Sequence, residues 1–165
     1  MKLTIFIDGA SRGNPGRSAI GVALYDPEGQ PLKEVGFEIG ITTNNIAEYT
    51  ALLYGLGETL LYVYNLSASS RLDGPAKTDA SVRPRSVRLR PDELELTIYS
   101  DSELLINQMT GCYQVKNEDI KRLHLLAHRL VSGLGKVSFE KLSHDENKIA
   151  DQLANKALDK SSRKL

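Results

Sequence analysis

Four acidic residues lie at positions where their carboxylates could act together. Asp8 and Asp101 each follow a short apolar run that is typical of a strand. Glu48 lies in about the first turn of a long predicted helix, and Asp151 in the second turn of the last predicted helix. Clustered carboxylates repel one another unless a cation lies among them, and Mg²⁺ prefers such oxygen ligands. The pattern therefore indicates a magnesium site, and two such ions can hold the attacking and leaving oxygens of a displacement at phosphorus.

Each of these residues also has an ordinary structural interpretation. The chain holds 21 acidic residues, and acidic side chains of soluble proteins are mostly solvated. A lone Asp after a strand is more often a turn or cap residue than a ligand, and Glu48 could simply interact with the helix dipole. Convergence also requires the first and fourth predicted strands to be neighbours. The cluster is therefore a hypothesis that depends on the surrounding sequence.

Apolar periodicity predicts the elements that would position these residues. Five runs predict strands at residues 3–7, 19–25, 32–39, 94–99 and 136–142. A stripe at helical spacing predicts a long helix, which Asn44 or Asn45 could cap; its members are Ile46, Tyr49, Leu53, Leu56, Leu60 and Val63. Shorter helices are predicted at 102–108 and 119–131. The last helix is predicted to start at a capping box from Ser143 to Glu146 and to bury Ile149, Leu153 and Ala157. This order predicts a mixed sheet covered by helices.

Length and composition describe an ordinary globular chain. The 165 residues carry 21 basic and 21 acidic groups, which predicts one domain without a global field for a polyanion. The single cysteine, Cys112, excludes an intrachain disulfide and favours a reducing compartment, so we expect a cytoplasmic protein. No apolar run is long enough to span a membrane, and the N-terminal run is too short for a signal peptide.

One segment, residues 67–93, lacks apolar periodicity and is rich in Ser, Ala, Arg and Pro. Its stretch from Arg83 to Arg90 holds four arginines, which could contact phosphates of a nucleic acid. The composition favours the other interpretation, a flexible and solvated insertion.

Four motifs around the acidic residues resemble those of type 1 ribonuclease H and occur in the same order. They span residues 5–16 (IFIDGASRGNPG), 42–52 (TTNNIAEYTAL), 99–106 (YSDSELLI) and 147–158 (NKIADQLANKAL). Residues 67–93 have no counterpart in the family pattern. The resemblance implies the ribonuclease H-like α/β fold, a five-stranded mixed sheet in the order 3-2-1-4-5 with flanking helices. It also implies hydrolysis of the RNA strand of RNA/DNA hybrids, which leaves 5′-phosphate and 3′-hydroxyl ends.

The resemblance further implies the roles of individual residues. Two Mg²⁺ ions, for which Mn²⁺ could substitute, would be held by Asp8, Glu48, Asp101 and Asp151. One ion would activate the attacking water and the other would stabilise the leaving 3′ oxygen. Nucleic-acid contacts are expected at Gly9, Ser11, Gly13, Asn14, Thr43, Asn44 and Asn45. Asn14 could reach a ribose 2′-hydroxyl, and the helix start at Thr43 and Asn44 is a ready phosphate site, although turn formation and helix capping explain the same residues.

His144 precedes Asp151 by seven residues, whereas in many family members a histidine that helps proton transfer lies about ten residues before the last Asp. The run from Ser143 to Asn147 resembles a shorter loop, Pro-Arg-Glu-x-Asn, with His144 at the place of the arginine. We therefore expect His144 to take part in catalysis, since a histidine titrates near neutral pH, while a solvated loop residue is the ordinary alternative.

Two departures from the family pattern concern substrate contacts. The link from Gln108 to Lys116 is short, so the basic helix and loop with which some members grip the hybrid is expected to be absent. Glu103 stands where some members have Gln near the scissile phosphate.

We expect a monomer whose partner is an RNA/DNA hybrid, with no membrane contact and no obligate protein partner. Two alternatives stay open. The chain could be a hybrid- or duplex-binding module without turnover, or a ribonuclease that also cleaves double-stranded RNA. The four carboxylates argue against pure binding, because negative charge beside phosphates gains nothing unless it holds a cation.

Overall fold

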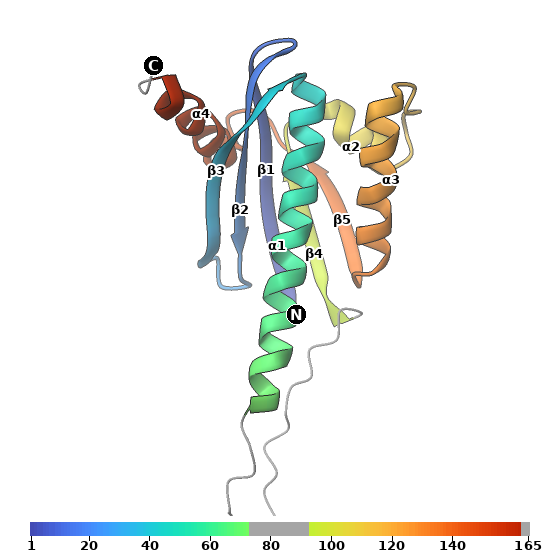
Figure 1. The fold of residues 1–165 in the computed structure, drawn as a ribbon. Coiled ribbons are helices and arrows are strands. Elements are labelled where there is room, and N and C mark those ends of the chain that lie inside the picture. Colours follow the sequence, from blue (N-terminus) through green and yellow to red (C-terminus); the bar gives the residue numbers. More distant parts are fainter. Residues whose placement is uncertain (73–92, 163–165) are drawn as a thin grey trace, which may run out of the picture.

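The computed structural model describes residues 1–72 and 93–162 (Figure 1). Residues 73–92, which include the arginine-rich stretch, lie outside the described residues, as do 163–165. Within the described ranges the strands are β1 (Lys2–Gly13), β2 (Gly16–Tyr25), β3 (Pro31–Thr42), β4 (Glu95–Ser100) and β5 (Lys136–Lys141). The helices are α1 (Asn44–Leu72), α2 (Glu103–Met109), α3 (Glu118–Ser132) and α4 (Lys148–Ser162). None of these helices is long and apolar enough to cross a membrane.

The strands form one mixed sheet in the order β3-β2-β1-β4-β5, which confirms the order implied by the family resemblance. β1 pairs antiparallel with β2 and parallel with β4, and β4 pairs parallel with β5. The first and fourth strands are therefore neighbours, as convergence of their acidic residues requires. In the parallel ladder Phe6 lies opposite Tyr99, so that Asp8 and Asp101 reach the same end of the sheet.

Helices cover both faces of this sheet. Figure 1 shows α1 along one face with α3 beside it, and α4 on the other side of the strands. Gly55 of α1 approaches the side chains of Ile5, Ile7 and Val22, whereas Gly21, the residue before Val22 in β2, faces the backbone of α4. Because successive residues of a strand point to opposite faces, α1 and α4 lie on opposite sides of the sheet.

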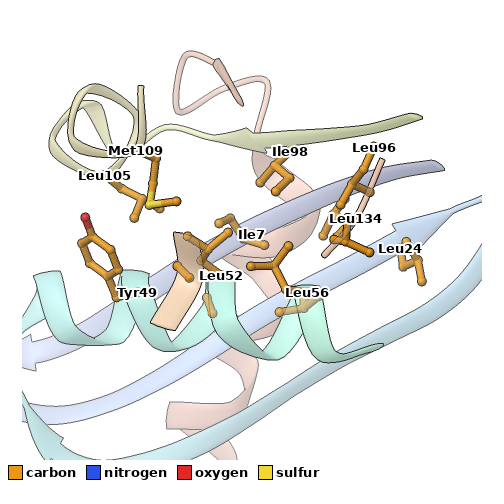
Figure 2. Close-up of a cluster of buried hydrophobic side chains, with 14 of the residues drawn as sticks. Ile7, Leu24, Tyr49, Leu52, Leu56, Leu96, Ile98, Leu105, Met109 and Leu134 are labelled. Atoms are coloured by element: carbon orange, nitrogen blue, oxygen red, sulfur yellow. The ribbon is translucent and has the colours of Figure 1, made fainter. Parts of the chain in front are cut away.

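The main hydrophobic core lies between α1 and the sheet. Figure 2 shows part of it, with labelled side chains from Ile7, Leu24, Tyr49, Leu52, Leu56, Leu96, Ile98, Leu105, Met109 and Leu134. The predicted stripe of the long helix is confirmed, because Tyr49, Leu56 and Val63 are buried and the other three members pack against the same core. Full burial of one such side chain contributes about 1.5–3 kcal/mol, so the stripe fixes α1 firmly on the sheet.

The buried face of α4 differs from the prediction. Ala150, Ala154 and Leu158 are buried, whereas the predicted positions, Ile149, Leu153 and Ala157, are only half-buried. The reason lies in the sheet, where glycine lets the helix backbone approach closely. A Cβ atom on Gly21 would lie 1.9 Å from the carbonyl oxygen of Ala150, and one on Gly36 would lie 2.1 Å from that of Leu153. Small residues on both sides therefore decide which face of α4 is buried.

Several elements are longer than predicted, among them β1 and α1. β1 continues from Lys2 to Gly13, so Asp8 lies within the strand, where it pairs with Gly21 of β2, and does not follow its end. α1 continues to Leu72, so residues 67–72 of the expected insertion belong to this helix. The side chain that caps the start of α1 is that of Thr43, whose Oγ1 accepts a hydrogen bond from the backbone N–H of Ile46 at 3.4 Å, and not that of Asn44 or Asn45.

The start of α4 also differs from the prediction. Glu146 reaches back to the backbone N–H of Ser143 at 2.9 Å, as a capping box requires, but residues 143–146 form a separate turn. The helix begins at Lys148, one turn later, and Asn147 precedes it. Asp151 therefore lies in the first turn of α4 and not in the second.

Candidate metal and nucleic-acid site

Three of the four predicted carboxylates converge at one end of the sheet. One oxygen atom from each of Asp8, Glu48 and Asp101 can be chosen so that all three lie within 4.8 Å of one another. Asp8 is 6% exposed and Glu48 is 4% exposed, while Asp101 is half-buried where the chain leaves β4. The strand neighbours that the sequence required are therefore present, and they bring these side chains together.

Gly9 explains how Glu48 comes so close to Asp8. A Cβ atom at position 9 would lie 2.3 Å from the backbone nitrogen of Glu48 and 2.4 Å from the carbonyl carbon of Ala47. Only a residue without a side chain lets α1 lie this close to β1 at that point. Gly9 is itself buried and lines the cavity of the acidic cluster, so the close packing of α1 accounts for a glycine here, and its expected contact with nucleic acid stays a prediction.

The electrostatics of this cluster are unfavourable for carboxylates alone. Burial raises the pKa of Asp8 to about 7, and the charges of Asp101 and Asp151 add to this effect. Burial, followed by the charges of Asp8 and Asp101, raises the pKa of Glu48 well above its usual value. Hydrogen bonds to Glu48 from the backbone of Gly9 and the side chain of Asn44 act in the opposite direction but do not reverse the shift.

Glu48 Oε2 indicates which kind of ligand suits the cluster. Within the described ranges it is one of two buried side-chain oxygen or nitrogen atoms that have no hydrogen-bond partner. A buried carboxylate oxygen without a partner is costly, and two further carboxylates nearby increase the cost. A divalent cation would satisfy all three groups, and a set of carboxylate oxygens matches the ligands that Mg²⁺ and Mn²⁺ prefer.

Asp151 and His144 complete the rim of the same cavity. Its lining includes all four carboxylates together with Ser11 and Asn44. Asp151 is half-buried in the first turn of α4, and its oxygens lie outside the close group of three. His144 Nδ1 lies 2.9 Å from Asp101 Oδ2, and the imidazole side chain is 73% exposed. The hydrogen bond to Asp101, followed by the charges of Asp151 and Asp101, raises the pKa of His144 above its usual value.

Asn147 is a site residue for which the sequence analysis gave no role. It is fully buried, and its Nδ2 donates hydrogen bonds to the carbonyl oxygen of Ile7 at 2.9 Å and to Asp101 Oδ1 at 3.2 Å. The amide thereby ties the loop before α4 to β1 and fixes one oxygen of Asp101. The sequence analysis placed Asn147 inside the predicted last helix, and its contact could not be predicted because it depends on how α4 packs against the sheet.

The expected nucleic-acid contacts lie around the turn between β1 and β2. Gly13, with φ of 105°, begins this turn, and its next residue, Asn14, accepts a hydrogen bond from the backbone N–H of Asn44 at 3.2 Å. The turn therefore touches the start of α1, where Thr43 is half-buried and Asn45 is exposed.

Ser11 points toward the same turn from β1. Its hydroxyl donates to the carbonyl oxygen of Gly13 and accepts from Ser18 Oγ at 3.0 Å. These hydrogen bonds stabilise the turn from within, so Ser11 holds the backbone of the residues that are expected to contact nucleic acid.

The structure agrees with the expected departures in the region of α2 and α3. No helix separates α2 from α3 within the described residues, so the basic helix is absent there. Glu103 accepts hydrogen bonds from Lys141 at 2.6 Å and from Tyr113 at 3.3 Å, and these partners lower its pKa. Lys141 therefore offsets part of the negative charge of Glu103, in an ion pair that is exposed to solvent.

Comparison with known proteins relates this chain and its fold to ribonucleases H. Residues 94–157 match a family model described as reverse transcriptase-like. Over 93% of its length the chain is 32% identical to ribonuclease HI from Halobacterium salinarum, of which it covers 63%. The crystal structure of RNase H1 from that archaeon matches with a TM-score of 0.76 and 31% identity, over 97% of this chain and 99% of that chain.

A second structure, of LC11-RNase H1 in complex with an RNA/DNA hybrid, matches with a TM-score of 0.72 and 30% identity, over 96% of this chain and 98% of that chain. Over 96% of its length the chain is also 32% identical to a bifunctional protein of Mycobacterium tuberculosis, of which it covers 36%. The chain thus spans about a third of its mycobacterial relative and less than two thirds of the archaeal one. The identity to the archaeal RNase H1, over nearly the whole of both chains and with the same sheet order, shows that this chain belongs to the ribonuclease HI family.

Proposed function

We propose that the chain is a metal-dependent endonuclease that hydrolyses the RNA strand of RNA/DNA hybrids. The observation that carries this proposal is the convergence of Asp8, Glu48 and Asp101 around a buried Glu48 oxygen that has no partner. Family membership supports it, as does the complex of LC11-RNase H1 with an RNA/DNA hybrid.

The four carboxylates are proposed to hold two Mg²⁺ ions, with Mn²⁺ as a substitute. Ions bound to Asp8, Glu48, Asp101 and Asp151 would supply the Lewis acidity that activates the attacking water and stabilises the leaving 3′ oxygen. The raised pKa values of Asp8 and Glu48 support this role, because they reflect burial first and then nearby negative charge, and a cation offsets both effects. The expected products carry 5′-phosphate and 3′-hydroxyl ends.

Residues at the start of α1 and in the neighbouring turn are proposed to bind the hybrid. A helix start favours a bound phosphate, and Thr43 and Asn44 lie there, with the backbone N–H of Asn44 already bonded to Asn14, so their side chains are the groups offered. Asn14 lies beside them, held by its bond to Asn44, and its amide is suited to a 2′-hydroxyl, the group that separates RNA from DNA. Asn45, which is exposed, would reach toward the minor groove.

His144 is proposed to move a proton during the reaction. Its Nδ1 is held by Asp101, which leaves Nε2 on the exposed side of the ring. Because its pKa is raised, the ring is an imidazolium over more of the neutral pH range and can donate a proton from Nε2 to the leaving 3′ oxygen.

The test is cleavage of an end-labelled RNA/DNA hybrid with Mg²⁺, with Mn²⁺ and with EDTA. The Asp101→Asn variant is compared with Asp145→Asn, a matched control whose side chain is 88% exposed. We expect metal-dependent internal cuts in the RNA strand alone, lost in Asp101→Asn and retained in the control. Mapping the ends of the fragments checks the proposed 5′-phosphate products.

Two outcomes would replace the proposal by one of its alternatives. Tight hybrid binding without cuts under either metal would indicate a binding module. Equal cleavage of double-stranded RNA in a parallel reaction would show that the site reads the A-form minor groove and not the hybrid. A DNA duplex serves as the third substrate, and we expect no cuts in it.

A further inference from the structure

Among the described residues, Asn155 makes the shortest hydrogen bond to the side chain of Asp151. It lies one turn further along α4, and its Nδ2 donates to Asp151 Oδ1 at 2.7 Å and to the backbone oxygen of Asp151 at 3.1 Å. Asn155 also lines the cavity that holds the four carboxylates. Its amide therefore binds Asp151, the predicted metal ligand that lies outside the close group of Asp8, Glu48 and Asp101.

Arg12 determines which way the amide of Asn155 faces. From the outer end of β1 its Nη2 donates to Asn155 Oδ1 at 3.3 Å and to Asp159 Oδ1 at 3.0 Å. A guanidinium group can only donate, so the carboxamide must turn its oxygen toward Arg12 and its NH₂ group toward Asp151. Asp159, one turn beyond Asn155, holds Arg12 in place through the ion pair.

We propose that Asn155 is a positioning residue for Asp151 and that Arg12 fixes the orientation of Asn155. The inference rests on the proposed function, because it gives Asp151 its importance as a metal ligand. A half-buried Asp in a first helical turn can adopt several rotamers, and ordering one of them costs free energy when a cation binds. The hydrogen bond from Asn155 selects one rotamer of Asp151 in advance and occupies Oδ1, which leaves Oδ2 for the cation.

The test compares two substitutions of the same chemistry on the same helix. Asn155→Asp keeps the size of the side chain, removes the donor and adds one negative charge. Gln152→Glu adds the same charge at an exposed residue adjacent to Asp151, without removing a bond to it. Gln152→Glu therefore controls for a negative charge added to this helix, while Asn155→Gln controls for a change of side chain at Asn155 that keeps a donor and adds no charge.

We expect the Mg²⁺ concentration for half-maximal cleavage to rise about tenfold in Asn155→Asp and less than twofold in Gln152→Glu, since a hydrogen bond to a charged group is of this strength. The KM for the hybrid at saturating Mg²⁺ should stay unchanged in both variants. Asn155→Gln keeps a carboxamide donor at the same helical spacing and should restore most of the Mg²⁺ response. Equal Mg²⁺ responses in Asn155→Asp and Gln152→Glu would overturn the proposal, even if Asn155→Asp lowered the unfolding temperature.

A second readout does not depend on cleavage. Mn²⁺ binding to the protein without nucleic acid can be followed through the electron paramagnetic resonance signal of the free ion. We expect Asn155→Asp to bind Mn²⁺ more weakly than Gln152→Glu, and unchanged binding would overturn the positioning role. If the wild-type protein bound Mn²⁺ in this way but cleaved no hybrid, the proposed function would fail while the positioning role stood.

The role of Arg12 is tested by a double-variant cycle. Arg12→Met should raise the half-maximal Mg²⁺ concentration about threefold on its own, because the amide of Asn155 is then free to flip. In the Asn155→Asp background the same change should add almost nothing, since the donor that it orients is already gone. Fully additive effects would show that Arg12 acts independently of Asn155.

Discussion

Replacing Asp8 by Asn should stabilise the metal-free protein at neutral to alkaline pH. The pKa of Asp8 is raised from 3.8 to about 7, first by burial and then by Asp101 and Asp151. Between these two pH values the folded state holds a proton that the unfolded state has lost, so stability falls as the pH rises through this range. A pKa difference of this size corresponds to about 4 kcal/mol once Asp8 is ionised in both states. An amide of the same shape avoids that cost.

Thermal unfolding in EDTA at pH 4.5, 6 and 8 measures the effect. Because neighbouring carboxyl groups share the repulsion, we expect Asp8→Asn to gain about 2–4 kcal/mol at pH 8, which is about 4–16 °C for a chain of this length. The gain should shrink toward pH 4, where the folded wild-type protein holds its proton. Added Mg²⁺ should raise the unfolding temperature of the wild-type protein and have much less effect on the variant, which lacks one ligand.

Asp145→Asn is the control for this experiment, because it removes a carboxylate that is 88% exposed and lies outside the cluster. It should leave the unfolding temperature nearly unchanged at every pH. An Asp8→Asn variant no more stable than the wild-type protein at pH 8 in EDTA would refute the reasoning. In that case the surroundings of Asp8 do not disfavour its charge, and the electrostatic argument for a cation site loses its basis.

Three further predictions concern packing, catalysis and the segment outside the described residues. Gly21→Ala should destabilise the protein by about 3 kcal/mol in urea unfolding, because the new methyl group would lie 1.9 Å from the carbonyl oxygen of Ala150. Gly57→Ala is the matched control, because a Cβ atom there has nothing within 4 Å, and it should stabilise α1 by about 0.5–1 kcal/mol. His144→Ala should lower kcat about 100-fold with an unchanged KM, and it should abolish the loss of activity that the wild-type protein shows as pH rises through the raised pKa of His144. Replacing residues 73–92 by a flexible linker should leave kcat unchanged, and a large fall would show that this segment shapes the site.

Much of the sheet and of the acidic cluster could be predicted from the sequence. Strand runs and the stripe of α1 follow from period alone, because Tyr49 and Leu56 must be buried for the helix to be stable. Asp8 and Asp101 each follow an apolar run, which indicates that their side chains lie at the same end of the sheet if the two strands are neighbours. The order of the strands came from the family resemblance, since periodicity does not choose between topologies.

What could not be predicted depends on how closely α4 approaches the sheet. The buried face of this helix is set by Gly21 of β2 and Gly36 of β3, so the apolar spacing within α4 predicted the wrong set of buried residues. The sequence analysis assigned no role to Asn147 or Asn155, because the residue type alone does not reveal which group an asparagine amide contacts in the fold. The roles of His144 and of the residues around the turn stay predictions.

Because α1 is long, its C-terminal end lies far from the acidic cavity at its N-terminal end. At 1.5 Å per residue, the helix carries the chain roughly 36 Å from Glu48 to its C-terminal end at Leu72 (Figure 1). A fluorophore, an affinity handle or a surface tether attached near the C-terminal end of α1 would therefore lie far from the acidic cavity. The fold thus offers an attachment point for immobilised or single-molecule measurements in which the cavity keeps its access to solution.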